Sequence, residues 1–234
     1  MNILILSLAP VFIIGGYIYF RDKYEKEPLR LLLLALLAGA LTVIPVFFVE
    51  QFLSGLGTFL NGLATVAWNA FAVAGFTEEL FKYTALYLLI WKSPEFNEKF
   101  DGIVYAVFVA LGFAGVENIL YVSQGGLSTG ISRALTAVPA HAIFGVTMGF
   151  YFGMAKFFEK ERGKLKRKAL LYPMLLHGIY DFILFTGIPW LTIVFVGFLG
   201  FLYFSAFNRM KKLSDQSIYN TDFDLLNDKF SKPT

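Results

Sequence analysis

Long apolar runs recur along the whole chain, and they constrain the fold more than any other feature. A helix needs about 20 apolar residues to cross the hydrocarbon core of a bilayer. Of the 234 residues, 57% are hydrophobic and only 16% are charged, whereas a soluble domain carries about 25% charged residues. We therefore expect an all-α, polytopic transmembrane helical bundle in a lipid bilayer. The first run has no basic segment before it and no small-residue cleavage site, so it is interpreted as a retained span.

Seven spans are predicted. The clear candidates are residues 3–20, 29–50, 101–122, 132–157, 169–187 and 189–207. The stretch 58–91 is longer than a single span needs. We expect an interfacial or re-entrant helix over 58–74 that breaks at Gly75, followed by one spanning helix; two crossings here, and eight spans in all, are the alternative.

The clusters of basic residues predict the topology. Cytoplasmic loops of membrane proteins are enriched in Lys and Arg. With one crossing in 58–91, all of the 20 Lys and Arg residues except Arg133 and Lys82 lie on one side. The N-terminus is then outside, Arg133 is outside and Lys82 lies within the membrane. Residues 1–207 form the transmembrane domain, and residues 208–234 form a polar cytoplasmic tail.

Composition also excludes several classes of protein. The chain has no Cys, which excludes disulfides and thiol chemistry. Its net charge is only +3, and its basic clusters flank apolar runs, a pattern that sets membrane topology and argues against nucleic acid as a partner. No soluble cofactor is indicated.

Ionisable residues inside the predicted spans are the strongest functional signal. Each costs roughly 2.5 to 3.5 kcal/mol at the centre of a spanning helix, so such residues are rare and usually functional. The chain has only two histidines, and both are in this set. The set is Glu78, Glu79, Lys82, Glu117, His141, His177 and Asp181.

The acidic members also have structural interpretations. Glu78 and Lys82 form an i,i+4 pair in the favourable order, while Glu79 at i,i+3 is less well placed. One cation cannot fully compensate two carboxylates. Glu117 alone could bond a neighbouring helix as a protonated acid. Glu50 is left out of the set, because it ends its predicted span and can reach the interface.

The histidines are predicted to face the interior of the bundle. Gly145, Gly149 and Gly153 follow His141 at four-residue spacing, which predicts a helix-packing surface on that side. His177 and Asp181 stand one turn apart, so the carboxylate can orient the imidazole. A buried structural histidine is the alternative in each case.

These groups share a level in the membrane. His141 lies about nine residues inside the outer end of its span and His177 about ten, or roughly 13 to 15 Å deep. Glu117 is roughly 8 Å deep, and Glu78 and Glu79 lie level with the histidines if their helix starts near residue 70. Scattered structural residues would have no reason to share the outer half of the bilayer.

The set suits metal-dependent hydrolysis. Two imidazoles and one carboxylate are the protein ligands of a catalytic zinc ion, and a further carboxylate acts as general base. We expect His141, His177 and Glu117 as ligands. Glu78 or Glu79 is then the base and the other a ligand or hydrogen-bond partner, while Asp181 orients His177. The HExxH motif of soluble metalloproteases is absent.

Four segments resemble the PrsW family of bacterial membrane-embedded metalloproteases, and more distantly the CAAX prenyl endopeptidase and bacteriocin-processing group. They are EELFK at 78–82, the F-x-x-x-E pattern from Phe113 to Glu117, PAHAIFG around His141, and HGIYD at 177–181. The likeness covers about residues 20 to 207. Glu117 stands where the distant group has His, and Asp181 where it often has Asn, and both differences favour PrsW.

The resemblance implies a multi-pass protease of the bacterial cell membrane, with residues 1–207 as its protease domain. Such a site-1 protease makes the first, extracytoplasmic cut in a single-span anti-sigma factor during stress. The family pattern implies that Glu78, Glu79 and His177 are needed for activity. The alternatives are a proton-coupled transporter, and a non-catalytic protein whose polar groups only join helices.

Overall fold

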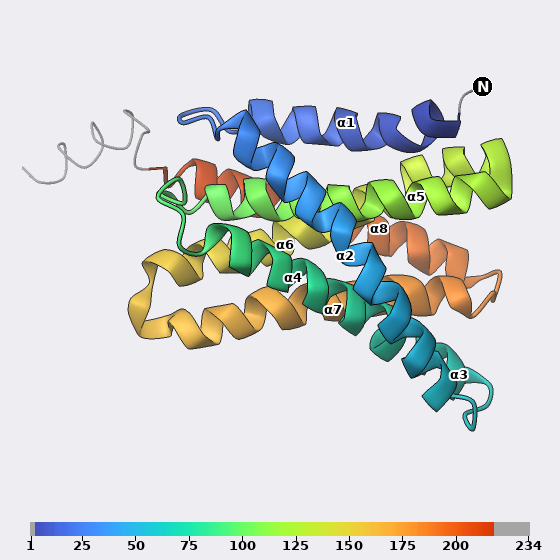
Figure 1. Cartoon of the computed structure of the whole chain (residues 1–234). Coiled ribbons are helices and arrows are strands. Elements are labelled where there is room, and N and C mark those ends of the chain that lie inside the picture. The colour runs from blue at the N-terminus through green and yellow to red at the C-terminus, as the bar shows by residue number, and fades with distance from the viewer. Residues whose placement is uncertain (1–2, 218–234) are drawn as a thin grey trace, which may run out of the picture.

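The computed structural model describes residues 3–217, and this part of the chain is helical throughout, without a strand (Figure 1). The predicted all-α class is confirmed. The tail prediction for 218–234 lies outside the described residues. In chain order the helices are α1 (Ile3–Arg21), α2 (Leu29–Leu56), α3 (Leu63–Ala67), the π-helix η1 (Trp68–Phe76), α4 (Thr77–Ile90), α5 (Asp101–Leu135), α6 (Ala137–Phe157), the 3-10 turn η2 (Glu159–Glu161), α7 (Arg162–Phe185) and α8 (Leu191–Ser214).

Five helical segments in the described range are long and apolar enough to cross a membrane. They are α1, α2, residues 101–157, residues 159–185 and α8, and the third of them contains both α5 and α6. Large apolar side chains such as Phe12, Phe48 and Ile193 are exposed on the outer helices. Such side chains suit lipid, so the bundle is a multi-pass membrane fold. The predicted seven spans and the orientation of the termini remain predictions.

The hairpin of α5 and α6 is the core of the bundle. In the apolar window of residues 101–157, 78% of the residues are buried, against 17% in α8 and 22% in α2. The other helices therefore surround this pair and face lipid on their outer sides.

Glycine permits the close approach of α5 and α6. A Cβ atom on Gly149 would lie 2.2 Å from the carbonyl oxygen of Gly102, and one on Gly153 would lie 2.1 Å from that of Lys99. Any larger residue would force the helices apart. The predicted packing surface is confirmed, and it turns the side of α6 that carries His141 toward the interior, where His141 is buried.

The predicted break at Gly75 is wrong. The chain is continuously helical from Leu63 to Ile90, through α3, η1 and α4. Gly75 serves close packing instead, because a Cβ atom there would lie 3.0 Å from the backbone of Gly178 and of Met174 in α7. The middle of this stretch is the nine-residue π-helix η1, which ends at Phe76, two residues before Glu78 of α4.

Other helix ends differ from the expected spans. The second span was expected to end at residue 50, but α2 continues to Leu56. The loop expected after residue 122 is helical up to Leu135, apart from a kink at Gly126, whose positive φ of 67° suits glycine. α8 continues past residue 207 to Ser214.

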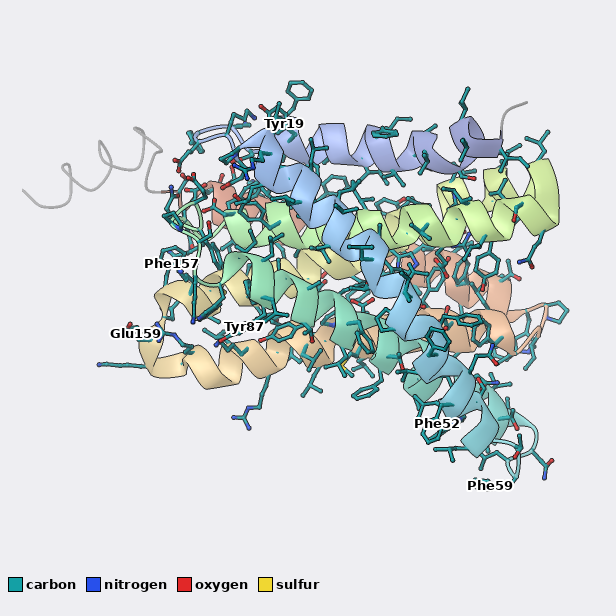
Figure 2. All side chains as sticks on the ribbon, viewed as in Figure 1. Tyr19, Phe52, Phe59, Tyr87, Phe157 and Glu159 are labelled. Carbon is teal, nitrogen blue, oxygen red and sulfur yellow. The ribbon has the colours of Figure 1, made fainter. Side chains whose placement is uncertain are left out.

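The connections between the helices lie at two opposite ends of the bundle. In Figure 1 the α1–α2, α4–α5 and α6–α7 connections lie at one end, together with the last turn of α8. The start of α1 and the α7–α8 turn lie at the opposite end. Figure 2 shows Phe52 and Phe59 on the part of α2 and its following turn that projects from the bundle, and both side chains are exposed.

Candidate metal centre

Two adjacent carboxylates lie in the first turn of helix α4, beside the core hairpin of α5 and α6. Glu78 and Glu79 are 5% and 0% exposed. The wide turns of η1 precede them, and the hydroxyl of Thr77 donates to the carbonyl of Ala72, five residues back, at 3.3 Å. Such π-turns are frequent at functional sites, where they place side chains that a regular helix would turn elsewhere.

Lys82 lies at the centre of the polar group. Its Nζ donates to Glu78 Oε2 and Glu79 Oε1, each at 2.9 Å. The expected preference for Glu78 is therefore not seen in these distances. Nζ also lies 3.1 Å from His141 Nδ1 and 4.1 Å from the centre of the Phe113 ring. Because an ammonium can only donate, Nδ1 of His141 must be an acceptor.

The other nitrogen of His141 faces helix α5. Nε2 lies 3.0 Å from Glu117 Oε2, and with Nδ1 as acceptor it donates to that carboxylate. Arg133 holds the same oxygen at 2.7 Å and also donates to Asn118 at 2.9 Å. Asn118 in turn donates to the carbonyl of Ser7 in α1. This chain of contacts fixes the plane and tautomer of the imidazole.

His177 has a similar arrangement. Its Nδ1 lies 3.0 Å from Glu79 Oε1, and its Nε2 lies 3.3 Å from Asp181 Oδ2. The predicted one-turn pairing of His177 with Asp181 is present. The two imidazole rings are 5.3 Å apart, centre to centre, and both are buried. Each histidine therefore turns Nδ1 toward the glutamates of α4 and Nε2 toward a carboxylate outside the pair.

Four buried side chains in the described part of the chain meet the requirements of a metal site. Glu78, Glu79, His141 and His177 each offer one donor atom, and these atoms all lie within 4.8 Å of one another. Carboxylate oxygen and imidazole nitrogen are ligands of zinc. The second oxygen of Glu79 is buried and has no hydrogen-bond partner. The donor set thus fits a divalent metal. Glu117 and Asp181 lie next to this set and contact its histidines.

A cavity of about 450 Å³ opens onto the centre. Glu78 lines it, whereas Glu79 lies behind the lining. All the other predicted acidic and histidine residues line it too. The remaining lining residues are Glu50, Gln51, Ser54, Asn69, Val73, Ala74, Tyr121, Ser132, Arg133, Thr136, Ala137, Ala140, Phe144, Tyr180, Leu184 and Phe185.

Two charged residues of this cavity were not predicted from the sequence. Glu50 was left out because its span was expected to end there, but α2 runs six residues further and carries Glu50 on the cavity wall. The apolar residues after Glu50 were the available signal. Arg133 was expected in an outer loop, and no pattern predicts its pairing with Glu117, 16 residues earlier.

The fold and site define a polytopic membrane protein with a buried Glu/His centre able to hold a metal. Residues 27–207 match the family model described as PrsW family intramembrane metalloprotease. The chain belongs to this family and is an intramembrane metalloendopeptidase of the bacterial cell membrane. No solved structure matches the chain.

Relatives resemble the chain over most of their length. Protease PrsW of Geobacillus kaustophilus is 42% identical over 184 residues, which cover 79% of this chain and 80% of the relative. Protease PrsW of Bacillus subtilis is 39% identical over 183 residues, covering 76% and 80%. Protease PrsW of Oceanobacillus iheyensis is 36% identical over 220 residues, covering 94% and 100%.

Proposed function

We propose that the chain is a zinc-dependent endopeptidase in which Glu79, His141 and His177 hold the metal and Glu78 is the general base. The four convergent donor atoms carry this proposal. A base must reach the reacting water, and Glu78 lines the cavity whereas Glu79 does not. Zinc, when bound, polarises the peptide carbonyl and lowers the pKa of water.

The remaining carboxylates position the histidines. The Nε2 of each histidine lies against Glu117 or Asp181, and each Nδ1 is turned toward α4, where that of His141 contacts Lys82 and that of His177 contacts Glu79. We therefore propose that Glu117 orients His141, in place of the ligand role expected from the sequence. Carboxylates that orient metal-binding imidazoles commonly affect metal affinity by 10- to 100-fold.

Glu78 then moves the proton during hydrolysis. It takes a proton from the attacking water and delivers it to the nitrogen of the leaving amine, so that one carboxylate serves both halves of the reaction. Lys82, which donates to Glu78 at 2.9 Å, holds that carboxylate in place.

The proposed substrate is a single-span anti-sigma factor that is cut on its extracytoplasmic side. This proposal includes seven crossings with the N-terminus outside, and it is supported by the connections that carry the basic clusters, which lie at one end of the bundle (Figure 1). Glu78 and Glu79 lie in the first turn of α4, and His141 lies in the first turns of α6. Both helices begin away from the end that holds the basic connections. Residues 1–207 are the proposed protease domain, and residues 208–234 the proposed cytoplasmic tail.

The decisive experiment measures zinc and cleavage in the same preparations. Wild type should hold about one zinc per chain, and His177→Ala should lose it. Glu78→Gln should keep zinc but no longer cut a co-expressed single-span anti-sigma factor. A wild-type protein prepared without chelator that holds no zinc would contradict the metal assignment, and full cleavage by Glu78→Gln would contradict the base assignment.

One observation favours a second role for this polar group, in helix packing, beside the metalloprotease activity of the family. Lys82 already supplies a positive charge among the four donors, with three contacts between 2.9 and 3.1 Å. If that ammonium were the only cation of the site, the group would serve helix packing alone. The metal measurement distinguishes the two functions.

A further inference from the structure

Glu50 is an isolated charge on an apolar helix. In α2, Leu29–Leu56, the only charged residues are Arg30 at the start and Glu50 near the end. Glu50 lies six residues before the last residue of the helix, or about 9 Å along its axis. A charged side chain at such depth is costly and generally faces a cavity or a partner. Glu50 faces the cavity of the metal centre.

Every other acidic residue of the cavity has a partner. Glu78 pairs with Lys82 at 2.9 Å, Glu117 with Arg133 at 2.7 Å, and Asp181 lies 3.3 Å from His177. Within residues 3–217, Glu50 makes no hydrogen bond or ion pair. The half-buried wall of α2 therefore presents one carboxyl group without a hydrogen-bond partner to whatever enters the cavity.

The wall that carries Glu50 is held in place. The indole Nε1 of Trp68 donates to the carbonyl of Leu53 at 2.9 Å, which joins α2 to the start of η1. Gly57 lies directly under that indole, since a Cβ atom there would be 2.4 Å from the ring. A carboxylate on a fixed wall loses little conformational freedom when it binds a ligand.

Neighbouring side chains on this wall suit a polypeptide. Gln51 and Ser54 of α2 and Asn69 of η1 line the cavity, and their side chains make no hydrogen bond with the described residues. Amide and hydroxyl groups can pair with the N–H and C=O groups of an extended peptide. A chain passing between this wall and Glu78 would place its own side chains near Glu50.

We propose that Glu50 is a specificity-determining residue that binds a Lys or Arg side chain of the substrate close to the cleaved bond. The inference rests on the proposed endopeptidase function and adds the charge class of the substrate. Glu50 lies outside the four metal-donor residues, so it acts on the substrate and not on the metal. A buried charge-assisted hydrogen bond contributes roughly 1.5 to 3 kcal/mol, about tenfold or more in selectivity.

The test uses zinc-loaded protein reconstituted in liposomes with a library of single-span test proteins. Their outer juxtamembrane segments are randomised, and the cut sites are read by mass spectrometry. Wild type should enrich Lys or Arg at one fixed position from the cut. Glu50→Gln should lower the Lys-to-Gln ratio of kcat/KM at that position about tenfold, and Glu50→Lys should favour Asp or Glu. Glu159→Gln, the same chemical change at an exposed site, should keep the wild-type preference.

Three results would overturn the proposal. A wild-type protein that cuts without charge preference would refute it and leave the protease function intact. Loss of all cleavage in Glu50→Gln with zinc retained would place Glu50 in the catalytic machinery. Zinc-loaded wild type that cuts no test protein would refute the proposed endopeptidase reaction and this inference with it.

Discussion

Each imidazole of the centre uses its two nitrogens for different purposes. In both histidines Nε2 lies near a carboxylate that orients the ring, and Nδ1 faces the glutamates of α4. The sequence predicted the members of this set because ionisable residues inside spans are expensive and rare. It did not predict which nitrogen faces which partner, because that depends on how α6 and α7 are rotated against α4.

Lys82 provides a residue-scale prediction. Removing one partner from a buried ion pair costs about 3 to 5 kcal/mol, because the remaining charges are uncompensated. Lys82→Met should therefore lower the thermal midpoint of the zinc-free protein. Zinc should restore much of that loss, since a divalent cation balances the same carboxylates. The measurement is the thermal midpoint with and without zinc, with Lys160→Met as the exposed control. A thermal midpoint that does not respond to zinc in either Lys82→Met or wild type would contradict metal binding at this group.

At the scale of elements, continuous helix replaces the break predicted at Gly75. Glycine in an apolar run predicts either a break or a close contact, and the sequence alone does not separate them. The backbone of α7 approaches Gly75 so closely that a Cβ atom there, 3.0 Å from Gly178 and Met174, would require α7 to shift. The π-helix η1 was also not predictable, because its wide turns are maintained by packing against α7 and have no residue pattern of their own.

The α1–α2 connection supports a pH prediction. Asp22 and Glu27 are 2% and 3% exposed. Burial, with the nearby charge of Glu98, raises the pKa of Asp22 to about 7. Burial also raises the pKa of Glu27 to about 7, although the hydroxyl of Tyr105 donates to it. Both folded-state pKa values lie above the unfolded values, so the folded state binds more protons between about pH 4 and pH 7 and loses stability as pH rises through that window.

The expected result is a higher thermal midpoint at pH 5.5 than at pH 8. Each kcal/mol shifts the midpoint by about 2 to 4 °C in a chain of this size. The double variant Asp22→Asn, Glu27→Gln should show a smaller difference, since neither introduced amide titrates and the amide oxygen at position 27 can still accept from Tyr105. An identical pH dependence in the variant and wild type would show that other groups are responsible.

At the scale of the whole molecule, the arrangement of connections governs which side of the membrane the centre faces. The connections that carry the basic clusters lie at one end of the bundle (Figure 1), whereas His141 lies in the first turns of α6, away from the α6–α7 connection. This separation is what an enzyme that cuts outside the cytoplasm requires. The proposed orientation of the centre requires an odd number of membrane crossings, and therefore requires residues 58–91 to cross the membrane once.

Topology can be measured directly, because the chain has no Cys. A cysteine placed at Ser128, which is exposed beyond the kink at Gly126, should react with a membrane-impermeant thiol reagent in intact cells. A cysteine at Glu159, whose side chain is 79% exposed in the α6–α7 connection (Figure 2), should react only after lysis. The reverse labelling pattern would invert the orientation and place the centre near the cytoplasm.

The sequence by itself determined the all-α membrane class, the family and the set of deep ionisable residues. These depend on composition, on helix-length apolar runs and on local motifs, all of which are properties of the chain before it folds. Only the tertiary structure decided that Glu117 lies against His141, that Arg133 reaches back to Glu117, and that Glu50 faces the same cavity. The first and the last of these bring separate helices together, and the second crosses the kink at Gly126 within α5. The rotation and separation of the helices are set by the close approach that glycine permits, which no local pattern specifies.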